Sequence, residues 1–340
     1  MTADPFPAAT ATAPATVRPG RATRAERLAS LSQRHGALTM LALAVIAASI
    51  VFEPFAGAEN LAGIAIQSSF VAVIALGMTF VIIGGGIDLS VGAVFALAGV
   101  LAAFGSQWGP VTALLLPLGA GALIGLVQGL LIARTGMAPF IVTLAGLLAA
   151  RGLMLALTTE GADTPLVPRD SAFLTLGRGV FLGLGAPVWI TIVLCGLGAV
   201  LLHRTRHGQY LFAVGGNEDA AALMGVPVAR VKVAAYALSG LLAALAGALN
   251  AARLGSGVTI LGVGMELDVI AAVVIGGTLL VGGAGAVGGT VCGVLILGVI
   301  QNVVNQIGTL TSSVQSVVSG AFLVVAVVAQ TYLSRAGRAR

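Results

Sequence analysis

The chain has 340 residues, of which 58% are hydrophobic and only 9% are charged, and its formal net charge is +5. In soluble proteins roughly a quarter of the residues are charged, so this composition excludes an ordinary water-soluble domain. Its mean hydropathy of +1.06 indicates more apolar surface than a soluble core can bury. We therefore expect most of the chain to lie in a membrane.

Residues 1–35 form an N-terminal tail rich in Ala, Thr, Pro and Arg, and we expect this tail to be disordered. Apolar runs fill most of the remaining chain. Because a helix needs about 20 residues to cross the ~30 Å apolar core of a bilayer, these runs predict about ten spans. We place the spans at 36–55, 60–83, 89–107, 111–134, 138–158, 187–202, 229–252, 266–281, 286–307 and 314–333. The expected fold class is an all-α membrane protein, a polytopic helical bundle with Gly-rich breaks over residues 36–334.

The basic residues are distributed unevenly around these spans. Five arginines precede the first span, five basic residues lie in two loops between spans, and three arginines end the chain in the stretch 335–340. If the N-terminus is cytoplasmic, all thirteen lie on the cytoplasmic side, as the positive-inside rule requires. We therefore expect both termini to be cytoplasmic, and we interpret the net charge as membrane topology and not as affinity for nucleic acid.

A glycine run interrupts the apolar sequence after residue 83. Gly84, Gly85 and Gly86 are poor helix formers, and Asp88 and Ser90 lie directly after them. Irregular backbone at membrane depth survives only where protein or a water-filled cavity satisfies its polar groups, and transporters build binding sites at such breaks. Two interpretations of the carboxylate stay open. It either holds the break in a conformation that changes during transport, or it is one of two candidate static N-caps, the other being the serine.

Arg151 lies inside an apolar span, where an ionised group must pair or face water. Its candidate partners by chemistry are Asp88, Glu266 and Asp268. The alternative is that the side chain extends its charged end toward the membrane interface. The sequence does not choose between these possibilities.

Amide side chains lie within or beside several spans, and Gln67 and Asn302 are examples. An amide both donates and accepts hydrogen bonds, which suits the passage of a cargo rich in hydroxyl groups. Amides also join neighbouring helices, typically by about 0.6–2 kcal/mol. Either role fits these two residues.

The loop 203–230 contains a short helix with its own start and stop signals. Asn217 can cap its N-terminus, two acidic residues come next, and Gly225 fits the left-handed position at its C-terminus. Leu223 and Met224 are expected to be exposed. Such a helix is either a simple connector or a plug for a groove on another protein.

A weaker glycine break occurs near the C-terminus. Gly276 and Gly277 end an apolar run and echo the break at residues 84–86. On the count of ten spans, both breaks face the same side of the membrane. The echo therefore suggests a parallel internal repeat.

The sequence lacks the usual signatures of catalysis. Its one lysine, Lys232, has no Gly-rich phosphate loop before it, so the chain lacks the P-loop of ATPases. Its three histidines lack the ligand spacing of a zinc site, and no Gly-x-Ser-x-Gly elbow is present. Cys195 and Cys292 lie in apolar runs and predict buried reduced thiols. We expect no catalytic residue, metal or cofactor.

Three sequence blocks, 77–92, 215–225 and 266–283, together resemble the ribose-type sugar permeases of bacterial ABC importers. Further details, among them residues 143–146 and 262–268, are similar to the YjfF-type permeases of galactofuranose importers. The resemblance implies an inner-membrane permease that imports a monosaccharide, with galactofuranose favoured over ribose or another pentose or hexose. It also implies an ABC ATPase subunit with two nucleotide-binding domains, a periplasmic sugar-binding protein and a second related permease as partners, all besides membrane lipid.

Taken with the resemblance, these observations nominate two sets of site residues. The substrate-pathway candidates are Asp88, Ser90, Gln67, Arg151 and Asn302. The candidates for coupling to the ATPase are Gly216, Asn217, Glu218, Ala221, Leu223, Met224 and Gly225. A second hypothesis is an ion-coupled secondary transporter that uses the buried charges as coupling groups, although such a protein does not need the capped cytoplasmic helix.

Overall fold

The computed structural model describes residues 24–307 together with 317, 320 and 321. The chain forms two compact units, Met1–Gly36 and Ala37–Arg340. Residues 24–36 of the first unit are helical, although the tail was expected to be disordered, because Ala, Leu, Glu and Arg dominate there and favour a helix. The expected span 314–333 lies almost entirely outside the described residues.

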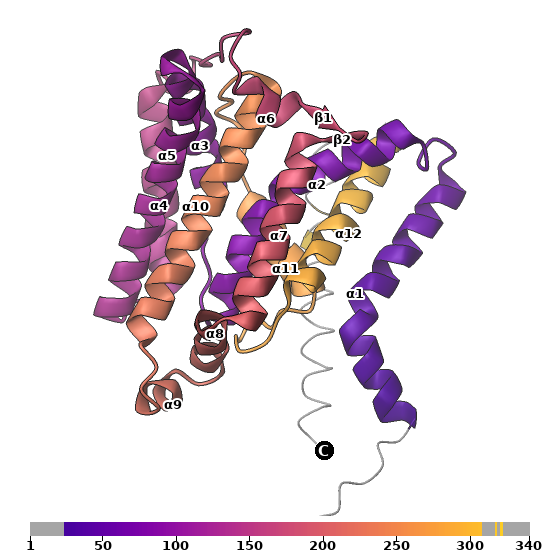
Figure 1. The fold of residues 1–340 in the computed structure, drawn as a ribbon, viewed down its shortest axis with the longest axis vertical. Coiled ribbons are helices and arrows are strands. Elements are labelled where there is room, and N and C mark those ends of the chain that lie inside the picture. Colours follow the sequence, from indigo (N-terminus) through magenta and orange to yellow (C-terminus); the bar gives the residue numbers. More distant parts are fainter. Residues whose placement is uncertain (1–23, 308–316, 318–319, 322–340) are drawn as a thin grey trace, which may run out of the picture. The chain divides into compact units, whose positions relative to one another are not determined.

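Most of the described residues are helical and very few lie in strands, and Figure 1 shows their arrangement. In chain order the elements are α1 (Arg24–Val51), α2 (Ala58–Ile83), α3 (Val91–Gly105), the 3-10 helix η1 (Ser106–Trp108), α4 (Pro110–Thr135), α5 (Pro139–Leu157), α6 (Leu174–Arg178), β1 (Val180–Phe181), β2 (Leu184–Gly185), α7 (Ala186–Arg204), α8 (Arg206–Gly216), α9 (Glu218–Leu223), α10 (Val228–Leu254), α11 (Met265–Ile275) and α12 (Val287–Gln306). Seven helical stretches among them are long and apolar enough to cross a membrane. The expected fold class, a polytopic all-α membrane protein, is confirmed.

The long helices of the second unit run between two ends, which we name the α9 end and the α6 end after the short helices found there (Figure 1). The two strands pair antiparallel as a small hairpin at the α6 end. Helix α10 lies at the centre of this bundle and packs against α2, α3 and α4. Its contact with α4 is close because a Cβ atom added at Gly121, Gly125 or Gly129 would overlap atoms of α10. These glycines therefore serve helix packing, as small residues do in membranes.

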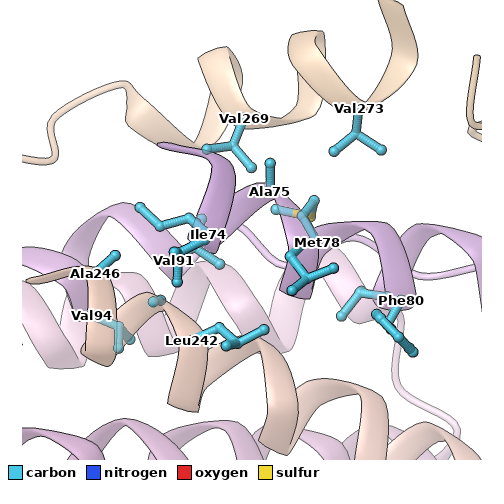
Figure 2. Close-up of a cluster of buried hydrophobic side chains, with 14 of the residues drawn as sticks. Ile74, Ala75, Met78, Phe80, Val91, Val94, Leu242, Ala246, Val269 and Val273 are labelled. Atoms are coloured by element: carbon cyan, nitrogen blue, oxygen red, sulfur yellow. The ribbon is translucent and has the colours of Figure 1, made fainter. Parts of the chain in front are cut away.

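The hydrophobic core lies where four helices meet. Ile74 and Met78 of α2 and Leu242 of α10 are buried beside residues from α3 and α11 (Figure 2). Val269 and Val273 of α11 are completely buried in the same cluster. The core therefore packs the two short helices, α3 and α11, against the two long ones.

The chain reaches α3 through a first non-helical segment, residues 84–90, which runs along α10. Gly86 packs against Tyr236 of α10, and Asp88 bonds to Ser239, eleven residues after the start of that helix. At 1.5 Å per residue, this places the carboxylate about 17 Å along a helix that is about 40 Å long. The break therefore lies well inside the bundle and not at its surface.

A second non-helical segment, residues 255–264, leads into α11 and runs along α3. A Cβ atom at Gly257 would lie 2.6 Å from the Cα atom of Val100, and one at Gly262 would overlap the carbonyl oxygen of Gly92. Helix α11 has 11 residues and is about 16 Å long, which is too short to cross a bilayer alone. The expected span 266–281 is therefore wrong, because the helix stops at Ile275.

The fold also contains two similar units, each made of a long helix, a non-helical segment and a shorter helix. Helices α2 and α10 are each succeeded by a non-helical segment and then a shorter helix, α3 or α11. Helix α2 starts at the α6 end, where Ile66 contacts Gly185, whereas α10 finishes there, where Arg178 donates a hydrogen bond to the carbonyl of Arg253. The two long helices thus run in opposite directions (Figure 1). Two such units in opposite orientation resemble the inverted repeats of many transporters. They are a different pair from the Gly84–Gly86 and Gly276–Gly277 echo, whose two loops meet at the hydrogen bond between Gly283 and Ile83, on the same side as expected.

Candidate functional site

The first break begins with a glycine turn at the end of α2. The backbone N–H of Gly85 donates to the carbonyl of Ile82 at 2.9 Å, and that of Gly86 donates to Val81 at 3.0 Å. Gly85 has a φ of +82°, so the pair of bonds forms a Schellman motif with glycine at its left-handed position. The turn satisfies two carbonyls that would otherwise be unpaired at the helix terminus.

Asp88 is completely buried, and its carboxylate accepts three hydrogen bonds. Its Oδ1 atom accepts from the backbone N–H of Ser90 at 2.9 Å and from the Ser90 hydroxyl at 2.6 Å. Its Oδ2 atom accepts from the hydroxyl of Ser239 on α10 at 2.8 Å. The bond to the backbone N–H two residues later forms an Asx-turn that leads into α3. Ser90 holds the N-cap position of α3, but its side chain makes no cap hydrogen bond to that helix and donates to Asp88 instead.

Helices α4, α5 and α10 all contact the first non-helical segment. The hydroxyls of Thr143 on α5 and Tyr236 on α10 each lie 3.4 Å from the carbonyl oxygen of Ile87. Gln128 of α4 is buried, and its Oε1 atom lies 3.3 Å from the Ser90 hydroxyl. A Cβ atom at Gly146 of α5 would overlap the Gln128 amide. Helices α4, α5 and α10 therefore enclose the break on several sides.

Ser239 and Gln128 were missed by the sequence reasoning. Both are buried polar residues in helices that otherwise read as apolar packing faces. The only sequence signal was the polar residue itself, and its partner lies far away in the chain. A buried polar side chain needs a partner, so each such residue was a weak indication of a contact.

Arg151 makes none of the carboxylate ion pairs considered from the sequence. Its Nη1 group donates to the backbone carbonyls of Thr259 at 3.0 Å and Leu261 at 3.1 Å. Both carbonyls belong to the second non-helical segment. Glu266 acts on the guanidinium through its charge, but the one ion pair within 4 Å among the described residues joins Lys232 to Glu218. The half-buried arginine is therefore a donor to unpaired backbone, a role that was not among the sequence-based expectations.

The remaining two pathway candidates lie on other elements. Gln67 is exposed in the first half of α2, toward the α6 end. Asn302 of α12 exchanges two side-chain hydrogen bonds with Asn60 of α2, at 2.8 and 3.2 Å. This is the interhelical role that was weighed for the amides. Of the five pathway candidates, the structure brings Asp88 and Ser90 into direct contact and places the other three among different partners.

The second glycine break, at Gly276 and Gly277 after α11, repeats the turn geometry of the first. The N–H of Gly277 donates to Val274 at 2.8 Å, and the N–H of Thr278 donates to Val273 at 3.2 Å. Gly277 has a φ of +92°, so this is again a Schellman motif that ends a helix. The Gly276–Gly277 echo therefore marks a shared way of stopping a helix.

Helix α9 has the local structure that its sequence predicts. The side chain of Asn217 accepts a hydrogen bond from the N–H of Ala220 at 2.9 Å, and Gly225 has a φ of +81°. Leu223 and Met224 have exposed fractions of 89% and 85%. An apolar pair is therefore exposed to solvent at the α9 end.

The other coupling candidates face the bundle or connect α9 to it. Ala221 is buried in the core, so it faces inward and away from the exposed pair. Glu218 forms a salt bridge of 2.6 Å with Lys232 at the start of α10. Gly216 ends the preceding helix α8, and no atom lies within 4 Å of the position that its Cβ would occupy.

Two small cavities lie beside the non-helical segments. One, of about 30 Å³, lies beside the first break and is lined by Gly84, Gly86 and Tyr236 among others. The other, of about 10 Å³, lies between α3, α10 and the second non-helical segment and includes Asn250. Each has room for only about one water molecule. A larger cargo would therefore require a passage outside these two cavities.

Comparisons with known proteins give one family match and several close relatives. Residues 60–327 match the family described as "Branched-chain amino acid transport system / permease component". The chain is 44% identical to the ribose import permease protein RbsC of Bacillus subtilis, over 87% of this chain and 92% of that protein. No solved structure matches this chain.

Two other relatives come from Escherichia coli. The L-arabinose transport system permease protein AraH is 38% identical, over 90% of this chain and 92% of that protein. The inner membrane ABC transporter permease protein YjfF is 39% identical, over 83% of this chain and 87% of that protein. The similarity in each case covers nearly the whole bundle.

Proposed function

This chain belongs to the permease-component family that matches its residues 60–327, and from this premise we propose that it is the membrane-spanning subunit of an ABC importer for a monosaccharide. It carries the cargo across the bacterial inner membrane while a partner ATPase hydrolyses ATP. The family description mentions branched-chain amino acids. Sugars are nevertheless the better proposal, because the relatives with 44% and 38% identity are named as ribose and arabinose permeases.

One observation about this chain carries the proposal that it works with an ATPase. Helix α9 is capped at both ends, is tied to α10 by the Glu218–Lys232 salt bridge, and presents Leu223 and Met224 to solvent. Exposed apolar side chains at the tip of a small rigid helix are typical of an interaction surface. We propose that this pair enters a groove on the ATPase, which puts the α9 end on the cytoplasmic side. The cytoplasmic location of both termini remains a prediction.

The transport pathway forms between this subunit and a second, related permease. The two cavities, beside residues 84–86 and 255–264, are far smaller than a sugar. Their size supports a passage at an interface over one inside the subunit. Asp88 and Ser90 then act by holding the first break in shape, since the carboxylate is completely buried. The exposed Gln67 is the candidate that can meet the cargo directly. A periplasmic sugar-binding protein delivers the sugar at the α6 end.

The identity of the sugar is the finer part of the proposal. Galactofuranose was favoured from the sequence, and that preference remains a prediction. Identity to the ribose permease is 44%, against 39% to YjfF, which makes ribose the first substrate to test. Arabinose, at 38%, is a third candidate.

Proteoliposomes that contain this permease, its ATPase and its second permease test the proposal. We expect radiolabelled ribose, arabinose or galactofuranose to enter only when ATP and the sugar-binding protein are both supplied. A Leu223→Asp variant should lose ATPase binding and import. A Met137→Asp variant, whose exposed side chain lies in the α4–α5 turn at the same end, should retain both. Uptake driven by an ion gradient without the ATPase would overturn the proposal in favour of a secondary transporter.

A further inference from the structure

Three chain segments that are distant in sequence meet at the α9 end through glycines. The last residue of α2, Ile83, accepts a hydrogen bond at its carbonyl from the N–H of Gly283 at 2.9 Å. Gly283 lies in the loop after the second break. Gly215, near the end of α8, packs directly against this hydrogen bond. The ends of α2, α8 and the loop after α11 are thus in direct backbone contact.

Three of the glycines in this cluster, Gly215, Gly282 and Gly283, have no room for a Cβ atom. A Cβ atom at Gly215 would overlap the Ile83 carbonyl oxygen and lie 2.7 Å from the Gly283 nitrogen. A Cβ atom at Gly282 would lie 2.8 Å from the Gly215 oxygen and 2.9 Å from the Cα atom of Gly85. Contacts this short essentially never occur at real Cβ atoms. We name Gly85, Gly215, Gly282 and Gly283 the glycine junction.

The backbone conformations of these residues also favour glycine. Gly85, Gly282 and Gly283 have φ values of +82°, +86° and +76°, which other residues rarely adopt. Backbone packed on backbone has no side-chain rotamers that could absorb a small displacement. A movement of one segment is therefore passed to the other two.

The junction lies between the exposed helix and both breaks. Gly215 is two residues before Asn217, which caps α9. Gly85 is three residues before the buried carboxylate of Asp88, and Gly282 is five residues after Gly277 of the second break. The chain distances are short on all three sides.

We propose that the glycine junction transmits movement of helix α9 to the two breaks, so that Gly215 is a positioning residue for the coupling of ATP hydrolysis to transport. The inference rests on the proposed function, because it assumes that α9 binds an ATPase. It adds the route by which that contact reaches the interior of the bundle. The salt bridge between Lys232 and Glu218 ties α9 to α10 alone and is separate from this route.

A Gly215→Ala variant of the full complex with its ATPase tests the junction. Hydrogen–deuterium exchange of residues 84–90 and 276–286 is measured with and without ATP, beside sugar imported per ATP hydrolysed. In the wild type, ATP should change exchange in both segments. In the variant, that change should disappear and the import ratio should fall at least about fivefold, the lower edge of typical coupling energies. ATP hydrolysis and ATPase binding should stay within twofold, which a simple packing defect would not spare.

Gly288→Ala is the matched control, because this glycine lies just after the second break and no atom is within 4 Å of its Cβ position. It should behave as the wild type. If Gly215→Ala fails to accumulate, Gly85→Ala replaces it, since a Cβ there would meet only the Gly215 Cα atom at 3.8 Å. Its left-handed conformation still disfavours alanine, so a smaller loss of the same kind is expected.

The outcomes separate the two proposals. If ATP changes exchange in the wild type, and neither Gly215→Ala nor Gly85→Ala weakens that change, the junction is overturned. An absence of any ATP-dependent change in the wild type also overturns it. If no sugar is imported, but the change occurs and depends on Gly215, the junction holds and the proposed cargo is wrong.

Discussion

The two non-helical segments solve one physical problem in opposite ways. Residues 84–90 bring their own charge, the buried carboxylate of Asp88, which accepts from Ser90 and Ser239. Residues 255–264 instead receive a charge from a neighbour, because Arg151 of α5 donates to two of their carbonyls. Backbone without a helical partner must be satisfied inside a membrane protein. The main buried polar group of the first segment is thus an acceptor of its own, whereas that of the second is a donor from another helix.

The two solutions also differ in burial. Asp88 is completely buried, whereas the Arg151 side chain is only half-buried. An unpaired group costs more where water cannot reach it. We therefore expect the first segment to be the more sensitive of the two to loss of its charge, and single substitutions in and around the two segments test this order.

The largest effect is expected for Asp88→Leu. The substitution leaves the Ser90 N–H and the Ser239 hydroxyl without their acceptor in the core, at roughly 1–3 kcal/mol for each group. Thermal unfolding in detergent and sugar uptake per inserted permease should both fall sharply. Asp88→Asn, which keeps one acceptor oxygen and the same shape, should lie between this variant and the wild type. A leucine variant that unfolds at the wild-type temperature would contradict the role assigned to this carboxylate.

A smaller loss is expected for Arg151→Met, which removes two hydrogen bonds from a charged donor at a half-buried site. We expect a destabilisation of about 1–3 kcal/mol, measured in the same unfolding assay. Glu266→Gln is the informative control, because it removes the neighbouring charge and leaves the hydrogen bonds to Thr259 and Leu261 in place. If the two variants lose equal stability, charge pairing and not carbonyl binding explains the arginine.

The smallest effect is expected for Thr143→Val. The threonine hydroxyl lies 3.4 Å from the Ile87 carbonyl and 3.0 Å from that of Pro139 in its own helix, so its bond to the break is the weaker one. The loss should not exceed about 1 kcal/mol. Uptake should stay close to that of the wild type. A loss as large as that of Asp88→Leu would mean that the break is held mainly by α5 and not by α10.

The helix ends illustrate how far sequence reasoning reaches. Asn217 and Gly225 bound α9 as predicted, and glycines stop α2 and α11 where the sequence indicates. These features depend on residues within one turn of each other. By contrast, the possibilities considered for Arg151 did not include the backbone carbonyls that it binds, and the span 266–281 was drawn too long. Both errors arose because hydropathy does not reveal whether an apolar run is helical throughout or what lies opposite it.

The sequence by itself determined the membrane class, the approximate number of helices, the two glycine turns and the capped α9 helix, since hydropathy, capping and turn formation are local properties. Only the tertiary structure decided that Ser239 completes the shell of Asp88 and that Arg151 binds backbone carbonyls. It also decided that α2 and α10 run in opposite directions and that glycines from three distant segments pack together. These features depend on atoms that are distant in the sequence. The pattern of residues along one segment does not indicate which other segment it will contact.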